Sequence, residues 1–105
     1  MLATTDIMTR LSDVKVKTSA ALRAAETDGG ASVVTVAVVK EFDSKADKAG
    51  RNSDGDGAAR DLVIELEQAG DSAKAAAEAD PGLGAEALDA VQAAHLAICI
   101  LKTEV

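Results

Sequence analysis

The chain repeats a short pattern of its own at an interval close to half its length. Residues Ala24–Gly30 read Ala-Ala-Glu-Thr-Asp-Gly-Gly, and 52 positions later Ala76–Gly82 read Ala-Ala-Glu-Ala-Asp-Pro-Gly. Each copy follows a helix-like segment and ends in residues that stop helices and form turns. The same offset also aligns apolar residues, pairing Leu11 with Val63, Val14 with Leu66 and Val39 with Val91. This repetition favours a helical hairpin that is used twice.

Apolar residues recur every three or four positions along four segments, as they do on the buried face of an amphipathic helix. We expect helices over about 6–27, 32–49, 58–79 and 85–103. The composition agrees, because 23 of the 105 residues are alanine, the strongest helix former. Short connections place sequential helices side by side and antiparallel. The prediction is an all-α, antiparallel up-down-up-down four-helix bundle in one domain, residues 1–105, with hairpins at 6–49 and 58–103 and a linker at 50–57.

The ends of these helices carry recognisable signals. Thr5 or Asp6 is placed to cap the first helix and Ser32 to cap the second, because their side-chain oxygens can accept free backbone N–H groups. Gly50 is placed to end the second helix. Gly70 interrupts the third, where a glycine in a helix interior costs about 1 kcal/mol relative to alanine. We therefore consider a kink or break at that position.

A different fold is suggested by two short apolar runs. Val33–Val39 is rich in β-branched residues and resembles a buried strand, and Leu96–Leu101 is equally apolar. If both were strands, the chain would be an α/β protein with strands at 33–39 and 96–101. A two-stranded sheet is marginal alone, so this alternative also requires a dimer. We favour helix, because the apolar run continues with helical spacing to Ala49.

Charge and composition argue against several classes of function. The net charge is −7, and the chain has no Trp or Tyr and one Phe. Such a chain repels phosphate backbones and lacks stacking platforms, so we expect no nucleic-acid partner. Its apolar runs are far shorter than the roughly 20 residues that span a bilayer, so we expect no membrane partner. With one cysteine and no apolar leader, the expected location is the cytoplasm.

The second and fourth helix-like segments carry more apolar surface than a small bundle can cover. A helix that is apolar all round is buried on more than one side. We expect this surplus apolar surface to be buried by self-association, most simply in a homodimer. The predicted interface consists of residues from the two apolar runs and their neighbours: Val33, Val36, Val39, Phe42, Ile98, Ile100 and Leu101.

The central loop resembles the front half of an EF-hand calcium loop. Asn52, Asp54 and Asp56 match the first three oxygen ligands of that loop, and Gly57 matches its glycine. The twelfth position, which supplies a bidentate glutamate, is Val63. Because the strongest ligand is missing, we interpret the segment as a plain connector. We expect neither a metal site nor a cofactor.

The single histidine, His95, offers the other candidate chemistry. Histidine phosphotransfer domains are four-helix bundles of similar size, and they surround the reactive histidine with lysines. Here Leu96, Ala97 and Ile98 follow, and the nearest lysine is Lys102. His95 and Cys99 lie four residues apart, on one helix face, but a structural zinc site needs four ligands. The others would have to be carboxylates or come from another subunit.

Acidic residues of the third segment, such as Glu65 and Glu67, read as a solvated face. No nucleophile motif, phosphate-binding loop or Glu-x-x-His motif accompanies them. The expected function is that of a non-enzymatic, acidic helical protein that acts through protein–protein contact and self-association. The alternative is a histidine phosphotransfer-like signalling bundle that uses His95.

Overall fold

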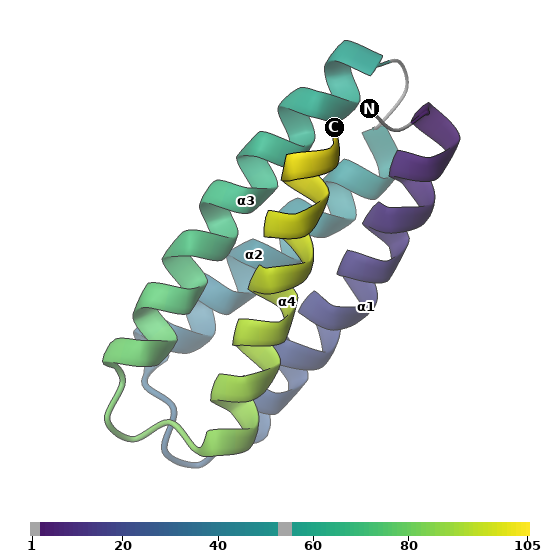
Figure 1. Ribbon diagram of the computed structural model, residues 1–105. Helices are drawn as coiled ribbons and strands as arrows, with labels where there is room; N and C mark the ends of the chain where they lie inside the picture. The colour runs from purple at the N-terminus through teal and green to yellow at the C-terminus, as the bar shows by residue number, and fades with distance from the viewer. Residues whose placement is uncertain (1–2, 53–55) are drawn as a thin grey trace.

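Four antiparallel helices make up the protein (Figure 1). The computed structural model describes residues 3–52 and 56–105. The helices are α1 (Thr4–Thr27), α2 (Val33–Asn52), α3 (Asp56–Ala79) and α4 (Ala85–Glu104). Helices α1 and α3 each pack against both α2 and α4, so α2 and α4 occupy opposite corners of the bundle. The predicted all-α bundle is confirmed and the strand alternative is wrong, since residues 33–39 lie in α2 and residues 96–101 in α4.

The helix ends follow the predicted signals only in part. Ser32 caps α2 as expected, because its Oγ accepts the backbone N–H of Thr35 at 3.1 Å. Helix α1 starts earlier than predicted: Ala3, which has no polar side chain, occupies its N-cap position. Gly50 does not end α2, which continues to Asn52. Helices α2 and α3 therefore extend into the predicted linker at 50–57 from its two ends.

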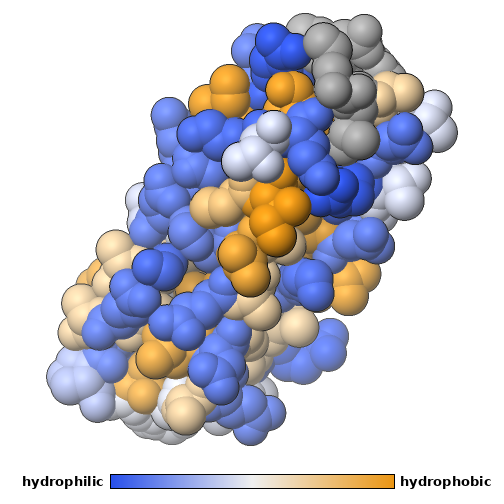
Figure 2. Space-filling view, viewed as in Figure 1, coloured by the Kyte–Doolittle hydropathy of each residue, from blue (hydrophilic) through white to orange (hydrophobic). Residues whose placement is uncertain are grey.

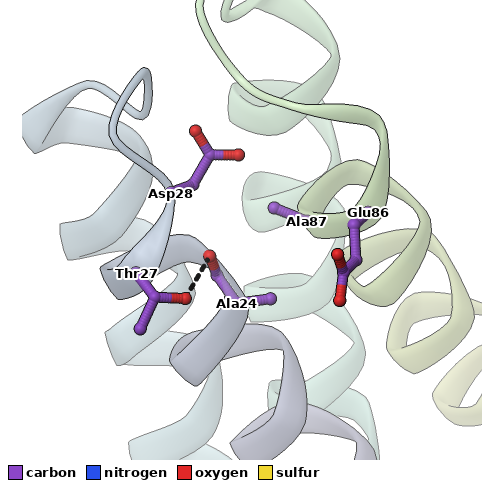
Figure 3. A pocket seen from close by; sticks show the side chains of 5 residues that line it. All are labelled: Ala24, Thr27, Asp28, Glu86 and Ala87. Atoms are coloured by element: carbon purple, nitrogen blue, oxygen red, sulfur yellow. Dashed lines mark hydrogen bonds between the residues drawn. The ribbon is translucent and has the colours of Figure 1, made fainter.

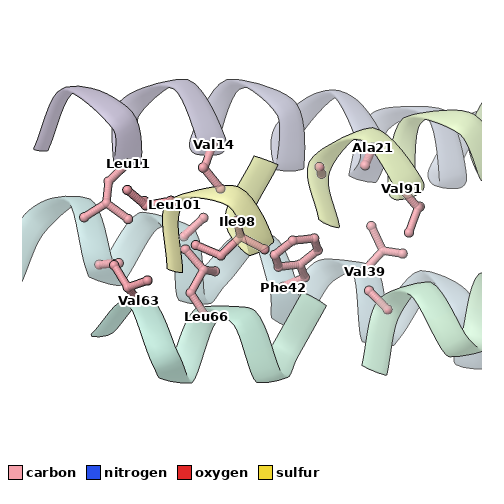
Figure 4. Packing of buried hydrophobic residues seen from close by; sticks show 14 of the residues in the cluster. Leu11, Val14, Ala21, Val39, Phe42, Val63, Leu66, Val91, Ile98 and Leu101 are labelled. Atoms are coloured by element: carbon pink, nitrogen blue, oxygen red, sulfur yellow. The ribbon is translucent and has the colours of Figure 1, made fainter. Parts of the chain in front are cut away.

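Helix α3 passes through Gly70 without a break, and packing explains why glycine is there. A Cβ at this position would lie 3.0 Å from Cζ of Phe42 and 3.3 Å from Cδ2 of His95. The missing side chain lets the Phe42 ring and the His95 ring approach the backbone of α3. Figure 4 shows Phe42 pointing into the core between the helices. The break considered at Gly70 is wrong, since α3 runs from Asp56 to Ala79 as one helix.

The core repeats itself along the chain with the 52-residue offset seen in the sequence. Of the described buried residues, all except Glu67 have a buried counterpart 52 positions away. The pairs are Ile7/Ala59, Leu11/Val63, Val14/Leu66, Thr18/Gly70, Ala21/Ala73, Ala25/Ala77, Thr35/Ala87, Val39/Val91, Phe42/Ala94, Ala46/Ile98 and Ala49/Leu101. Several members differ in size in compensating directions, as with Phe42/Ala94 and Ala46/Ile98. The two hairpins are thus structural repeats that fill one shared core.

The loops that close the two hairpins bind each other. Asp28 accepts the N–H of Gly30 in its own loop at 2.8 Å and that of Gly84 in the other loop at 2.8 Å. Asp80, 52 positions later, accepts the N–H of Gly82 at 3.0 Å and that of Ser32 at 2.9 Å. Ser32 and Gly84 precede α2 and α4, so each aspartate caps a helix of the opposite hairpin and complements its dipole.

Close approach of the loops accounts for the glycine in each repeat. A Cβ on Gly30 would overlap the carbonyl oxygen of Gly82, and a Cβ on Gly82 would overlap that of Gly30. The Asp-x-Gly sequence of both copies therefore has two separate roles. The aspartate links the loops by hydrogen bonds, and the glycine allows their backbones to touch.

Candidate functional site

A polar cluster lies in the seam between α3 and α4. Oδ1 of Asp71, on α3, lies 2.6 Å from Nε2 of His95, on α4. Sγ of Cys99, one turn after His95, lies 3.4 Å from the same nitrogen. The three ligand-type atoms lie within 4.8 Å of one another. The fold thus brings a carboxylate, an imidazole and a thiol together around one point.

The three side chains differ in their access to solvent. The His95 side chain is 16% exposed, whereas that of Asp71 is 57% exposed. Cys99 is half-buried. Glu67, one turn before Asp71, is buried and accepts a hydrogen bond from Nζ of Lys102 at 3.1 Å. The prediction of a solvated Glu67 is wrong, because its position on α3 turns it into the seam beside α4.

Electrostatics in the seam favour a charged Asp71 and a neutral Cys99. The hydrogen bond from His95 lowers the pKa of Asp71 below its ordinary value. Burial raises the pKa of the Cys99 thiol, and the nearby carboxylates Glu67 and Asp71 raise it further. The thiol is therefore protonated at neutral pH. Among the described residues, Lys102 pairs with the Glu67 carboxylate beside the cluster.

The equivalent place in the first hairpin is built differently. The 52-residue offset pairs Asp43 of the first hairpin with His95 of the second. By the same offset, Ser19 corresponds to Asp71 and Lys15 corresponds to Glu67. Oδ1 of Asp43 accepts hydrogen bonds from Lys15 at 2.8 Å, from Thr18 at 2.8 Å and from Ser19 at 3.0 Å. In the first hairpin, therefore, one lysine and two hydroxyl groups donate hydrogen bonds to the carboxylate. The second site has no such internal lysine at the matching position.

Comparison of the chain with protein-family models, with curated proteins and with solved structures gave no match.

Asp43 provides a prediction for stability and its pH dependence. Burial alone would raise the pKa of Asp43, but the hydrogen bonds from Lys15, Thr18 and Ser19 outweigh it and hold the pKa below 3.8. Its contribution is therefore complete above pH 3.8 and is lost as the pH falls through the lower value of the folded state. Asp43→Asn should lower the free energy of unfolding by about 1–3 kcal/mol at neutral pH.

Urea unfolding of the wild type and Asp43→Asn, at neutral pH and in acid, measures this effect. The difference between the two proteins should shrink as the pH falls below the folded pKa of Asp43. Asp13→Asn, at an exposed position of the neighbouring helix α1, is the control and should change little. A difference that is the same at both pH values would contradict the role given to the charge.

The residues predicted as an interface do not form one surface. Val39, Phe42, Ile98 and Leu101 are fully buried in the monomer core, and Val36 is half-buried. Only two of the seven are exposed, Val33 on α2 and Ile100 on α4. Because α2 and α4 occupy opposite corners, the two apolar runs cannot join in one patch. The bulk of both runs fills the core, where it compensates for the many alanines.

The calcium-loop candidates lie next to the gap in the described residues or inside it. Asp54 lies outside the described residues, Asn52 is the last residue of α2, and Asp56 is the first residue of α3. Glu65 pairs with Lys45 and Lys48. In the described part of the chain, His95 and Cys99 are the sequence candidates that the fold brings into a ligand cluster, with Asp71 as an addition.

A hollow lies at the loop end of the bundle (Figure 3). It has a volume of about 140 Å³ and is lined by residues at the end of α1 and the start of α4: Ala24, Thr27, Asp28, Glu86 and Ala87. Pockets that hold small-molecule ligands are usually larger, roughly 300–1,000 Å³. Asp28 is also committed to the contact between the loops. We regard this hollow as a consequence of the loop packing.

None of the described helices carries an apolar run long enough to cross a bilayer.

Proposed function

We propose that the protein is a non-enzymatic helical bundle that acts through protein–protein contact, and that its first partner is a second copy of itself. The observation that carries this proposal is the outer face of α4. Leu96 is 60% exposed and Ile100, one turn later, is 45% exposed. Figure 2 shows apolar surface over the C-terminal half of α4, surrounded by hydrophilic residues.

The sequence of α4 supports a second apolar stripe outside the core. Residues Ala90–Leu101 contain no Asp, Glu, Lys or Arg. Ala93, Leu96, Ala97 and Ile100 recur with the spacing of a helical stripe. Two large apolar residues flanked by alanines allow another helix to approach closely. Exposed apolar patches with polar rims are typical of interaction sites.

A second copy is the simplest partner for such a stripe. In a two-fold dimer the same patch of each subunit forms the interface. The stripe then has only to be complementary to itself, and no second kind of surface is required. Two α4 helices crossing near Leu96 and Ile100 would bury both stripes. Polar residues that lie beyond this stripe, such as Asp89 and Lys102, would form the rim.

We expect Leu96→Glu and Ile100→Glu each to weaken self-association by at least tenfold, about 1.4 kcal/mol. Both side chains are exposed in the monomer, so the variants should retain the helical circular dichroism of the wild type. The measurement is sedimentation equilibrium at physiological salt, because the net charge of −7 opposes association at low salt.

Val16→Glu is the matched control, since Val16 is 70% exposed but lies on α1. It should leave the association constant unchanged. A wild-type protein that remains monomeric at millimolar concentration would refute self-association. Equal weakening by Val16→Glu would refute its assignment to α4.

The histidine phosphotransfer alternative gains no support from the geometry. Nε2 of His95 is held by Asp71 at 2.6 Å, and the ring is largely covered. Glu67 and Asp71 would repel a phosphoryl group at that nitrogen. For these reasons protein–protein contact remains the proposal.

A further inference from the structure

We propose that Asp71, His95 and Cys99 form a binding site for a zinc-like divalent transition-metal ion in the seam between α3 and α4. The proposal is independent of self-association, because the seam faces α3 and not the outer side of α4. Thiolate, imidazole and carboxylate together select Zn²⁺ and similar ions rather than Mg²⁺ or Ca²⁺, which take oxygen ligands.

The spacing of the ligand atoms is close to that of a tetrahedral site. With Zn–S near 2.3 Å and Zn–N near 2.0 Å, a tetrahedral angle separates the two ligand atoms by about 3.5 Å. Sγ of Cys99 and Nε2 of His95 are 3.4 Å apart. These residues are one turn apart on α4, so their side chains share one face of the helix. The two ligands are thus pre-positioned.

Asp71 can complete a three-ligand site with a small movement. Its Oδ1 is now hydrogen-bonded to Nε2 of His95 at 2.6 Å. Coordination of both atoms to one ion requires a separation of about 3.3 Å, an increase of roughly 0.7 Å. The Asp71 side chain is 57% exposed and has room to make this movement. A water molecule would take the fourth position, since Lys102 already holds Glu67.

The comparison of the two hairpins shows why a cation suits this place. In the first hairpin, Nζ of Lys15 lies 2.8 Å from the carboxylate of Asp43. In the second hairpin, the position of Lys15 holds Glu67, and that of Ser19 holds Asp71. Substitution of a lysine and a hydroxyl by two carboxylates leaves the second site with one lysine, Lys102, for two acids. A bound divalent ion would supply the missing positive charge.

Binding involves one deprotonation and no redox step. The Cys99 thiol loses its proton to solvent as the S–metal bond forms. Neutral His95 binds through the lone pair of Nε2, so the proton that Nε2 shares with Asp71 moves through solvent to Nδ1 of the same ring, and the imidazole loses none. The Asp71 carboxylate binds as it is. Formation of the S–metal bond should therefore release one proton per chain.

The test uses Co²⁺ as a spectroscopic probe and Zn²⁺ as its competitor, on the full-length chain. We expect one Co²⁺ per chain, thiolate-to-cobalt charge transfer in the near ultraviolet, visible bands of a tetrahedral ion, and their loss on addition of Zn²⁺. Cys99→Ser should abolish the charge-transfer band. His95→Ala and Asp71→Asn should each weaken Co²⁺ binding by at least about tenfold.

Glu78→Gln is the matched control, because Glu78 is also on α3 and also bonds to α4, through Gln92. It should leave Co²⁺ binding unchanged. Circular dichroism of each variant shows whether it folds, and Asp71→Asn, at an exposed position, remains informative if His95→Ala does not. The proposal is overturned if the wild type gives no charge-transfer band, or if Asp71→Asn binds Co²⁺ as tightly as the wild type does.

Discussion

Phe42→Ala should remove about 3–5 kcal/mol from the free energy of unfolding, the largest effect expected of any single truncation in this chain. Phe42 is the single aromatic residue and is fully buried. Its counterpart in the second hairpin, Ala94, is small, so the core contains no second aromatic ring at the matching position. Domains of this kind are stable by about 5–15 kcal/mol, so the variant should approach the limit of folding. Urea unfolding followed by circular dichroism measures the loss.

Gly70 provides an internal control for this cavity. In the wild type, Gly70→Ala would press a methyl group against the Phe42 ring, with Cβ 3.0 Å from Cζ. In the Phe42→Ala background the methyl group keeps one close neighbour, Cδ2 of His95 at 3.3 Å, but it would fill part of the cavity and add helix propensity of up to about 1 kcal/mol. The second substitution should therefore destabilise the wild type and stabilise the variant. Additive effects would contradict the contact, and Val33→Ala, at an exposed position, should change stability little.

The periodicity of the sequence is sufficient to predict the four-helix bundle. It does not predict which residues of the two apolar runs lie in the core and which are exposed. Val33–Val39 is helical because its pattern continues with helical spacing into the core, through Val39 and Phe42. The larger share of the apolar surface of these runs is buried in the core beside alanine-rich neighbours, while Val33, Val34, Leu96 and Ile100 stay exposed. In six of the eleven core pairs, a larger residue in one hairpin corresponds to a glycine or alanine in the other, as with Phe42/Ala94 and Ala46/Ile98. Such compensation depends on three-dimensional neighbours that periodicity does not identify.

The candidate site, too, could be predicted from the sequence only in part. The spacing of His95 and Cys99 indicates that they share one helix face, but Asp71 lies 24 residues before His95, on another helix, and helical spacing does not connect it to them. A signal was present, because residues equidistant from a hairpin turn lie opposite each other. The turn near Leu83 places Asp71 opposite His95 and Glu67 opposite Cys99. The distances among these atoms depend on Gly70, whose missing side chain lets the His95 ring approach α3.

Gly30→Ala should destabilise the protein by about 1–3 kcal/mol, although Gly30 is exposed and lies in a loop. A methyl group there would overlap the carbonyl oxygen of Gly82, and this backbone atom cannot turn aside as a side chain can. The loops must separate, and their separation stretches the hydrogen bonds from Gly84 to Asp28 and from Ser32 to Asp80. Urea unfolding measures the loss of stability, and amide hydrogen exchange at Ser32 and Gly84 should become faster.

Gly29→Ala is the control that separates loop contact from backbone freedom. Gly29 is adjacent to Gly30, nothing lies within 4 Å of its would-be Cβ, and its φ is outside the left-handed region. Alanine there should be neutral or stabilise the fold by up to about 1 kcal/mol, because it restricts the unfolded chain. If Gly29→Ala and Gly30→Ala lower the free energy of unfolding equally, the loop requires the backbone flexibility of glycine and not the contact between loops. If only Gly30→Ala lowers the free energy of unfolding, the contact between the two Asp-x-Gly loops stabilises the packing of the two hairpins.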